Sequence, residues 1–254
     1  MRALRSARHR VAAAFRQLVG SRGSDDDHIK SFLSLRDTLE QAKLAGQSVG
    51  DYIDTRYQVP GATRETIQEL AQCGVLNDKV ETICEIGPGS GRYLEHVVRL
   101  CKPKSYEIYE TAREWSNWLV ETYHVTGRQP DGISLRHTGS RSVDLVHAHK
   151  VFVYLDFIVS FQYFEEMVRV TRSGGYIVFD IVSERCMPEA DIEKWAARRI
   201  YYPHVIPREM VIAFFVKRQC SLHYNFFAPL LLGRSEYFVF LKGQDPKPKT
   251  STGP

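Results

Sequence analysis

Short apolar runs alternate with amphipathic segments from residue 81 to residue 182. Runs typical of strands fall at 81–86, 105–109, 125–129, 143–149 and 176–182. Helical periodicity lies between them, at 91–100, 112–122 and 157–170. This succession predicts a parallel sheet with helices on both faces. We therefore expect an α/β fold with a Rossmann-like, doubly wound sheet.

The pattern changes on either side of this region. Before it, helices are predicted to end near Leu44, Tyr57 and Gln72. After it come helices at 189–199 and 208–216, and then an antiparallel closing pair at 220–227 and 236–241. We expect three parts: a basic segment and helical cap (1–56), a main domain with a substrate-side insertion (57–242, insertion about 184–220), and a disordered tail (243–254).

Composition excludes several classes of protein. Charged residues make up 25% of the 254 positions, which is ordinary for a globular protein, and no apolar run is long enough to span a bilayer. The net charge of +4 is too small to indicate a nucleic-acid partner. The five cysteines form no CxxC pair, which favours a reducing, cytoplasmic environment.

The most informative motif is Glu85-Ile86-Gly87-Pro88-Gly89-Ser90-Gly91, between a predicted strand and helix. Glycines allow a tight turn and close approach to a ligand, and N–H groups at a helix N-terminus attract anions. Glu110 ends the next strand, where an acid can accept hydrogen bonds from a ribose. Arg92 occupies the position where a dinucleotide site needs its third glycine, which argues against NAD.

These residues resemble the first motif of class I S-adenosylmethionine-dependent methyltransferases, and the resemblance covers about 57–242. Strings 143–146 and 172–176 are similar to the family's fourth strand and the turn before its fifth. The resemblance implies S-adenosylmethionine as the cofactor, with its carboxylate on the amides of 87–91. The implied cofactor-binding residues are Glu85, Gly87, Gly89, Gly91, Arg92, Glu110, and the adenine-contacting pair Asp131 and Gly132.

A closer resemblance, carried by 107–110, 144–155 and 227–242, is to bacterial sugar O-methyltransferases. Among these are enzymes of methylated mannose polysaccharide synthesis in mycobacteria. It implies methyl transfer to a hydroxyl of a sugar or oligosaccharide in polysaccharide biosynthesis. Aromatic faces and polar tips suit a sugar, so the candidate substrate residues are Tyr154, Tyr201, Tyr202 and His204. Simple packing over the sheet is the alternative for these side chains.

Two histidines, His147 and His149, end the fourth strand. A hydroxyl acceptor benefits from a base, and histidine accepts a proton near neutral pH. We expect one of them to be the general base, and the sequence does not separate them. With Asp144 and Asp180 they could instead bind a divalent metal such as magnesium. Magnesium prefers oxygen ligands, so no metal site is favoured.

Alternative functions stay open at this point. The acceptor could be a lipid or a phenol, with the arginine-rich 1–24 segment on a membrane surface. A regulator that binds the cofactor without turnover is the rival of another class. An RNA methyltransferase would need a stronger basic face. Besides the acceptor, a second copy of the chain in a homodimer is a possible partner.

Overall fold

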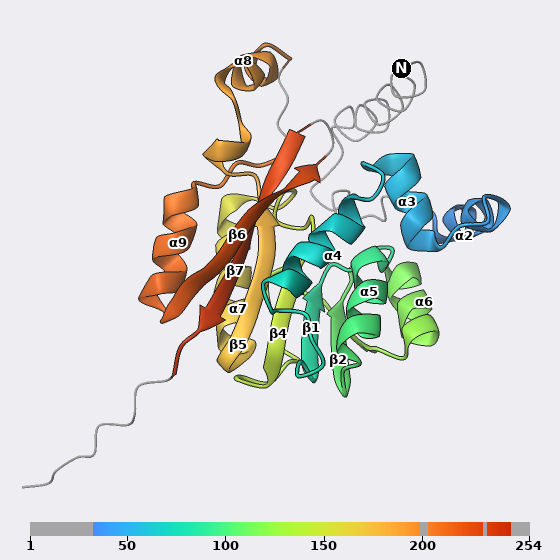
Figure 1. Ribbon diagram of the computed structural model, residues 1–254, viewed down its shortest axis with the longest axis horizontal. Helices are drawn as coiled ribbons and strands as arrows, with labels where there is room; N and C mark the ends of the chain where they lie inside the picture. The colour runs from blue at the N-terminus through green and yellow to red at the C-terminus, as the bar shows by residue number, and fades with distance from the viewer. Residues whose placement is uncertain (1–32, 199–202, 231–232, 245–254) are drawn as a thin grey trace, which may run out of the picture.

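The computed structural model describes residues 33–198, 203–230 and 233–244, and its centre is a seven-stranded sheet of order β3-β2-β1-β4-β5-β7-β6 (Figure 1). The first five strands are mutually parallel, and β7 runs antiparallel to both β5 and β6. The predicted Rossmann-like sheet is therefore confirmed. The strands are β1 Thr82–Ile86, β2 Ser105–Tyr109, β3 Thr126–Arg128, β4 Val143–Ala148, β5 Thr171–Ile181, β6 Cys220–Leu230 and β7 Gly233–Lys242.

Helices cover both faces of the sheet. Buried side chains of α4 (Ala62–Gln72), α5 (Arg92–Cys101) and α6 (Arg113–Tyr123) share one core cluster. Those of α7 (Phe157–Val170) and α9 (Arg208–Lys217) belong to a second cluster on the opposite face. The remaining helices are α2 (Leu35–Leu44), α3 (Val49–Tyr57), the short η2 (Glu184–Cys186) and α8 (Glu189–Arg198).

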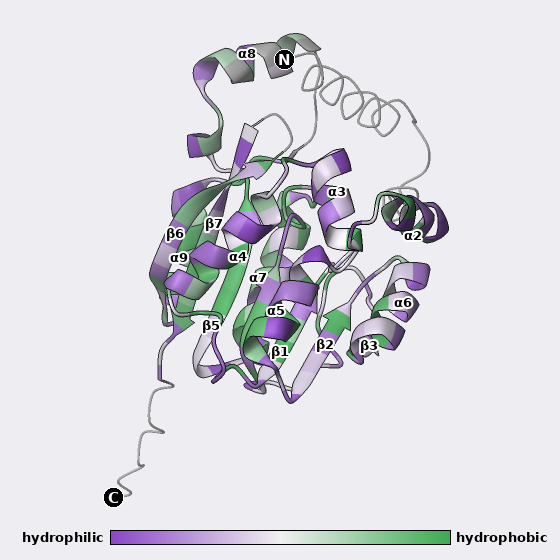
Figure 2. Cartoon of the chain, turned by 45° about the vertical axis from the view of Figure 1, so that its right-hand side comes forward, coloured by the Kyte–Doolittle hydropathy of each residue, from purple (hydrophilic) through white to green (hydrophobic). Residues whose placement is uncertain are grey.

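Strand alternation decides which residues meet each cluster, because successive side chains point to opposite faces. In β4, Val146 and Ala148 face α7, whereas Leu145 packs on the α5 side. His147 alternates with Val146 and Ala148 and therefore shares the side of Leu145. Figure 2 shows the hydrophobic strands at the centre and the more hydrophilic outer helix surfaces. We call the two sides of the sheet the α5 face and the α7 face.

The glycine pair Gly174–Gly175 does not lie before the fifth strand, as the sequence suggested. It lies inside β5, where the register with β4 shifts between Val143 and Leu145. A Cβ on Gly175 would lie 2.9 Å from the backbone oxygen of Asp144. Glycine occurs at bulges in strands as well as in turns. At position 175 the close approach of the Asp144 backbone explains why a glycine is present.

Two helices, α2 and α3, lie in the described part of the segment for which a helical cap is predicted. Ser34 and Ser48 cap α2 and α3, and Gly50 lets α3 approach α5, since a Cβ there would be 3.3 Å from the Arg92 Cα. The basic segment at 1–32 and the tail from residue 245 lie outside the described residues. Among the described helices, none has the length and hydropathy needed to cross a membrane.

Candidate cofactor and acceptor site

The glycine turn joins β1 to α5, and its three glycines all have positive φ values, at 60°, 55° and 74°. Packing requires two of them. A Cβ on Gly87 would be 2.8 Å from a Val151 methyl group, and a Cβ on Gly91 would overlap a methyl group of Leu119. At Gly89 a Cβ would meet nothing within 4 Å. The turn is therefore closed on two sides and open at its centre.

The N–H groups of the three glycines already donate within the protein, which differs from the expectation that they meet the carboxylate of the cofactor. The N–H of Gly87 donates to the Tyr109 carbonyl at 2.9 Å, and that of Gly91 donates to the Pro88 carbonyl at 2.9 Å. The N–H of Gly89 donates to Glu110 at 2.7 Å. The first turn of α5 provides amides instead, because its N-cap residue has no side-chain cap.

Glu110 lies against the glycine turn, as predicted from its place after β2. Its Oε2 accepts from Gly89, and its Oε1 accepts from the N–H of Ala112 at 2.8 Å. Burial raises the pKa of Glu110, although these hydrogen bonds favour its charged form. Each carboxylate oxygen has a second lone pair, which can accept a ribose hydroxyl. The open centre, uncapped helix and adjacent acid together fit a nucleoside cofactor with a carboxylate.

Arg92 has a different set of contacts from the one its predicted cofactor-binding role implies. Its guanidinium forms an ion pair with Asp54 at 2.7 Å and donates to the Thr63 hydroxyl at 3.2 Å. Arg92 and Asp54 are both buried. Arg92 thus connects the start of α5 to α3 and to the start of α4, and it holds the cap over the helix that carries the turn.

Asp131 and Gly132 follow β3, at the same edge of the sheet as the glycine turn. The Asp131 carboxylate accepts hydrogen bonds from the N–H and hydroxyl of Ser134, at 2.7 and 2.5 Å, and from the N–H of Ile133 at 3.0 Å. Partial burial acts against ionisation, but these hydrogen bonds outweigh it and lower the pKa of Asp131. The role of Asp131 and Gly132 as an adenine-contacting pair stays a prediction.

Glu85 and His147 lie side by side on the α5 face, because β1 and β4 pair them in register. Both are 1% exposed, and Tyr106 connects them. Its hydroxyl donates to Glu85 Oε2 at 2.7 Å and is 2.9 Å from His147 Nε2. Burial raises the pKa of Glu85 to about 8 and lowers the pKa of His147 to about 3. Neither side chain faces a solvent-filled space.

His149 lies one residue past β4 and is 6% exposed. The ring of Tyr93 stacks on it with centroids 4.0 Å apart, and its Nδ1 is 3.2 Å from the Tyr237 hydroxyl. Burial is the main cause that lowers the pKa of His149, and the neighbouring His147 adds to it.

Asp144 is not near His147 and His149. Its carboxylate accepts hydrogen bonds from the N–H groups of Glu81 and Thr82 at the start of β1. The alternative in which Asp144 binds a metal together with the two histidines is therefore wrong.

The candidate substrate residues are placed in part. The His204 N–H donates to the Val153 carbonyl at 2.9 Å, next to half-buried Tyr154. Val205 bridges to Val182, just past β5. The return segment 203–206 therefore runs along the carboxyl ends of β4 and β5, beside Tyr154. Tyr201 and Tyr202 lie outside the described residues.

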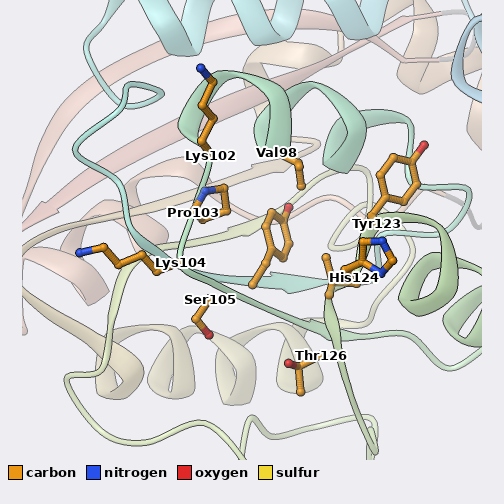
Figure 3. A pocket seen from close by; sticks show the side chains of 10 residues that line it. Val98, Lys102, Pro103, Lys104, Ser105, Tyr123, His124 and Thr126 are labelled. Carbon is orange, nitrogen blue, oxygen red and sulfur yellow. The ribbon is translucent and has the colours of Figure 1, made fainter.

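A pocket of about 400 Å³ lies elsewhere, where α5 and α6 end and β2 and β3 begin (Figure 3). Lys102, Lys104 and His124 line it. The glycine turn lies at the opposite end of α5. Ligands of open α/β sheets bind at the carboxyl ends of the strands, so this pocket is not the acceptor site.

Two contributors were not identified from sequence. Tyr106 links Glu85 to His147, and Asp54 neutralises Arg92. Alternation along β1, β2 and β4 would have placed Tyr106 on the side of Glu85 and His147. No local signal marks Asp54, which is 38 positions away from Arg92 in sequence.

Comparisons with known proteins bear on the fold and on the type of reaction. Residues 84–179 match the family model described as a methyltransferase domain. No curated protein matches the sequence. An O-methyltransferase family protein from Burkholderia thailandensis superposes with a TM-score of 0.57 at 12% identity, covering 84% of this chain and 68% of that one.

Two further solved structures contain S-adenosylhomocysteine. The magnesium protoporphyrin IX methyltransferase of Synechocystis has a TM-score of 0.57 at 10% identity, covering 82% of this chain and 94% of its own. An N-methyltransferase from Bradyrhizobium japonicum has a TM-score of 0.52 at 18% identity, covering 71% and 87%. At these identities the structural likeness shows the fold alone. The match of residues 84–179 to a methyltransferase domain, together with the geometry of the turn, indicates an S-adenosylmethionine-dependent methyltransferase with a Rossmann-like fold.

Proposed function

We propose that this enzyme transfers the methyl group of S-adenosylmethionine to a hydroxyl of a sugar or an oligosaccharide. The cofactor supplies an activated methyl group, so the protein mainly has to align donor and acceptor. The residues proposed to hold the cofactor are Glu110, the first turn of α5, and the Asp131–Gly132 pair.

The observation that carries the acceptor side is the path of segment 203–206. The backbone N–H of His204 donates to the carbonyl of Val153, the residue before Tyr154, near the carboxyl ends of β4 and β5, and ligands of open α/β sheets bind at such ends. An aromatic ring with a polar tip and an imidazole suit a polyol acceptor. The structural neighbours methylate both nitrogen and oxygen according to their names, so their likeness does not select the acceptor atom.

The histidine base stays a prediction. His147 is 1% exposed on the α5 face, so an acceptor from solvent does not reach it in this structure. His149 is the better placed of the two, because it lies just past the carboxyl end of β4 and is 6% exposed. The Tyr93 ring stacks on His149, so a base role for His149 requires that ring to move aside when the acceptor binds.

The test is an acceptor screen with the full-length enzyme, in which formation of S-adenosylhomocysteine is measured. The panel contains mannose and glucose oligosaccharides, simple phenols, and lipid vesicles. Turnover with an oligosaccharide, a raised KM in Tyr154→Ala, and an unchanged KM in Tyr176→Phe are expected. Turnover with phenols or vesicles alone would replace the sugar by one of those acceptors. Cofactor binding without turnover on any acceptor would favour a regulator.

A further inference from the structure

Glu85, His147 and His149 form a compact group on the α5 face, below the glycine turn. One oxygen or nitrogen atom from each residue lies within 4.8 Å of the other two. The three residues are 1%, 1% and 6% exposed. They come from two paired strands and the residue that follows one of them, so the backbone of the sheet fixes their positions.

Two atoms of this group have no hydrogen-bond partner among the described residues: Nδ1 of His147 and Nε2 of His149. Buried polar atoms are nearly always paired, and leaving one unpaired costs about 1–3 kcal/mol. His147 Nδ1 is 3.9 Å from Glu85 Oε1. That distance is too long for a hydrogen bond, but it is short enough for both atoms to bind one ion between them.

The other polar atoms of these residues are held by tyrosine hydroxyls. Tyr106 donates to Glu85 Oε2 and is 2.9 Å from His147 Nε2, and Tyr237 is 3.2 Å from His149 Nδ1. If His147 Nε2 and His149 Nδ1 carry the protons, each ring has its lone pair on the unpaired nitrogen. Metal-binding histidines are typically oriented by such an outer partner on the second nitrogen.

We propose that Glu85 Oε1, His147 Nδ1 and His149 Nε2 bind a divalent transition-metal ion, and that Zn²⁺ fits this ligand set best. Two imidazole nitrogens and one carboxylate oxygen are common zinc ligands, whereas magnesium demands mostly oxygen. Zinc bonds of about 2.0–2.1 Å place tetrahedral ligands roughly 3.3–3.5 Å apart. The side chains must therefore close by about 1 Å, which small χ rotations provide, and a fourth position is left for water.

The charges around the group agree with a bound cation. Two cations act electrostatically on His149, and both are already paired: Arg92 with Asp54 at 2.7 Å and Lys150 with Asp180 at 3.0 Å. Glu85 has no such partner, and a buried carboxylate without one is strongly disfavoured. A divalent ion would stabilise its charged form and connect β1 to β4 beneath the turn.

This inference goes beyond the proposed function and does not depend on which acceptor is methylated. The proposal also assigns His149 the role of a metal ligand in place of a general base. A metal bound to Nε2 takes the lone pair that a general base would use, so the metal-ligand role and the base role exclude each other.

The experiment is a titration of ZnCl₂ into full-length protein that has been stripped with a chelator, in competition with a metal-sensitive dye. One ion per chain is expected, with a rise in Tm. His149→Gln and Glu85→Gln should each weaken binding at least about 100-fold, and Tyr106→Phe about 10-fold. The matched control is His137→Gln, since His137 is an exposed histidine outside the proposed ligand set, and this variant should bind zinc as wild type does.

Two results would overturn the proposal: no binding at one ion per chain by the wild type, or unchanged affinity in both His149→Gln and Glu85→Gln. Circular dichroism shows whether these variants fold. If they do not, X-ray absorption at the zinc edge of the loaded wild type decides. Nitrogen and oxygen neighbours with an imidazole signature support the site, whereas a sulfur neighbour would assign the ion to the free cysteines. Neither the zinc titration nor the X-ray absorption measurement depends on sugar methylation, so failure of the proposed function would leave both results unchanged.

Discussion

The two faces of the central sheet solve the problem of burial in different ways. The α7 face is closed by stacked phenylalanines, with Phe179 in ring contact with Phe164, Phe215 and Phe238. The α5 face contains the buried Glu85 and His147 toward the carboxyl ends of the same strands, linked by Tyr106. Each strand contributes to both faces, because successive side chains along a strand point to opposite sides of the sheet.

The difference separates stability from chemistry. Apolar burial gains free energy without directional requirements, so the α7 face can serve as a continuous scaffold. Polar groups on the α5 face cost free energy unless each is paired, and the unpaired ones mark places where a ligand is expected. The glycine turn and Glu110 lie at the edge next to this polar region, so the scaffold positions the functional groups without providing them.

The largest expected effect is on the α7 face. Phe179→Ala removes a fully buried ring, and the resulting cavity should cost about 3–5 kcal/mol in the free energy of unfolding, measured by urea denaturation. Phe227→Ala is the control, because that ring is 39% exposed, and it should cost far less. Equal losses in the two variants would mean that the α7 face is not the main scaffold.

The next effect concerns the connection between the cap and α5. Asp54→Ala leaves the Arg92 guanidinium buried without its counter-ion, which should cost about 3 kcal/mol. The control is Asp51→Ala, whose ion pair with Arg64 is exposed and should contribute little. A similar small loss in both variants would show that Arg92 finds another partner, and its predicted contact with the cofactor would then be the first candidate.

Much of this architecture follows from local sequence. β2 and α7 have the predicted bounds, and the predicted and observed starts and ends of most other elements differ by a residue or two. Apolar periodicity and glycine placement are local properties, which is why they sufficed. The Gly174–Gly175 bulge was missed because a turn and a bulge use the same residue type.

The site was less predictable than the fold. Glu110 directly follows β2, as the strand pattern indicated, while its contact with the ribose stays a prediction. The use of the glycine amides inside the protein, and the Arg92–Asp54 pair, depend on contacts between distant segments. His149 is covered by Tyr93 of α5, and His147 is contacted by Tyr106 of β2, so the burial of the two histidines does not follow from β4 alone.

A smaller effect is expected from a single hydroxyl on the α5 face. Tyr106→Phe preserves the ring but leaves Glu85 Oε2 and His147 Nε2 without that partner, at a cost of about 1–3 kcal/mol. Tyr176→Phe serves as the control, because the Tyr176 side chain is half-buried on β5. Thermal and urea unfolding of both variants measure the difference. Identical stability would contradict a paired network on this face.

The smallest effect depends on pH and lies at the edge of the α7 face. Hydrogen bonds from Arg169 are the main cause that lowers the pKa of Glu166, which also accepts from the Leu135 N–H at 2.8 Å. Because the pKa is lower in the folded protein, the stabilisation is present above the unfolded value of about 4.5 and is lost as pH falls. Glu166→Gln should therefore cost about 1 kcal/mol at pH 7 and less at pH 4. An equal cost at both values would contradict this assignment.

Cofactor binding at the glycine turn is the central claim, and calorimetric titration of S-adenosylmethionine into the full-length protein tests it most directly. The account predicts one site per chain, with binding weakened at least about 10-fold in Glu110→Ala through loss of the ribose acceptor and of the bond to Gly89. The affinity of Glu110→Gln, which retains an acceptor oxygen, should lie between those of the wild type and Glu110→Ala. Absence of binding to the wild type, or equal affinity in all three proteins, would contradict a cofactor site built on Glu110 and the start of α5.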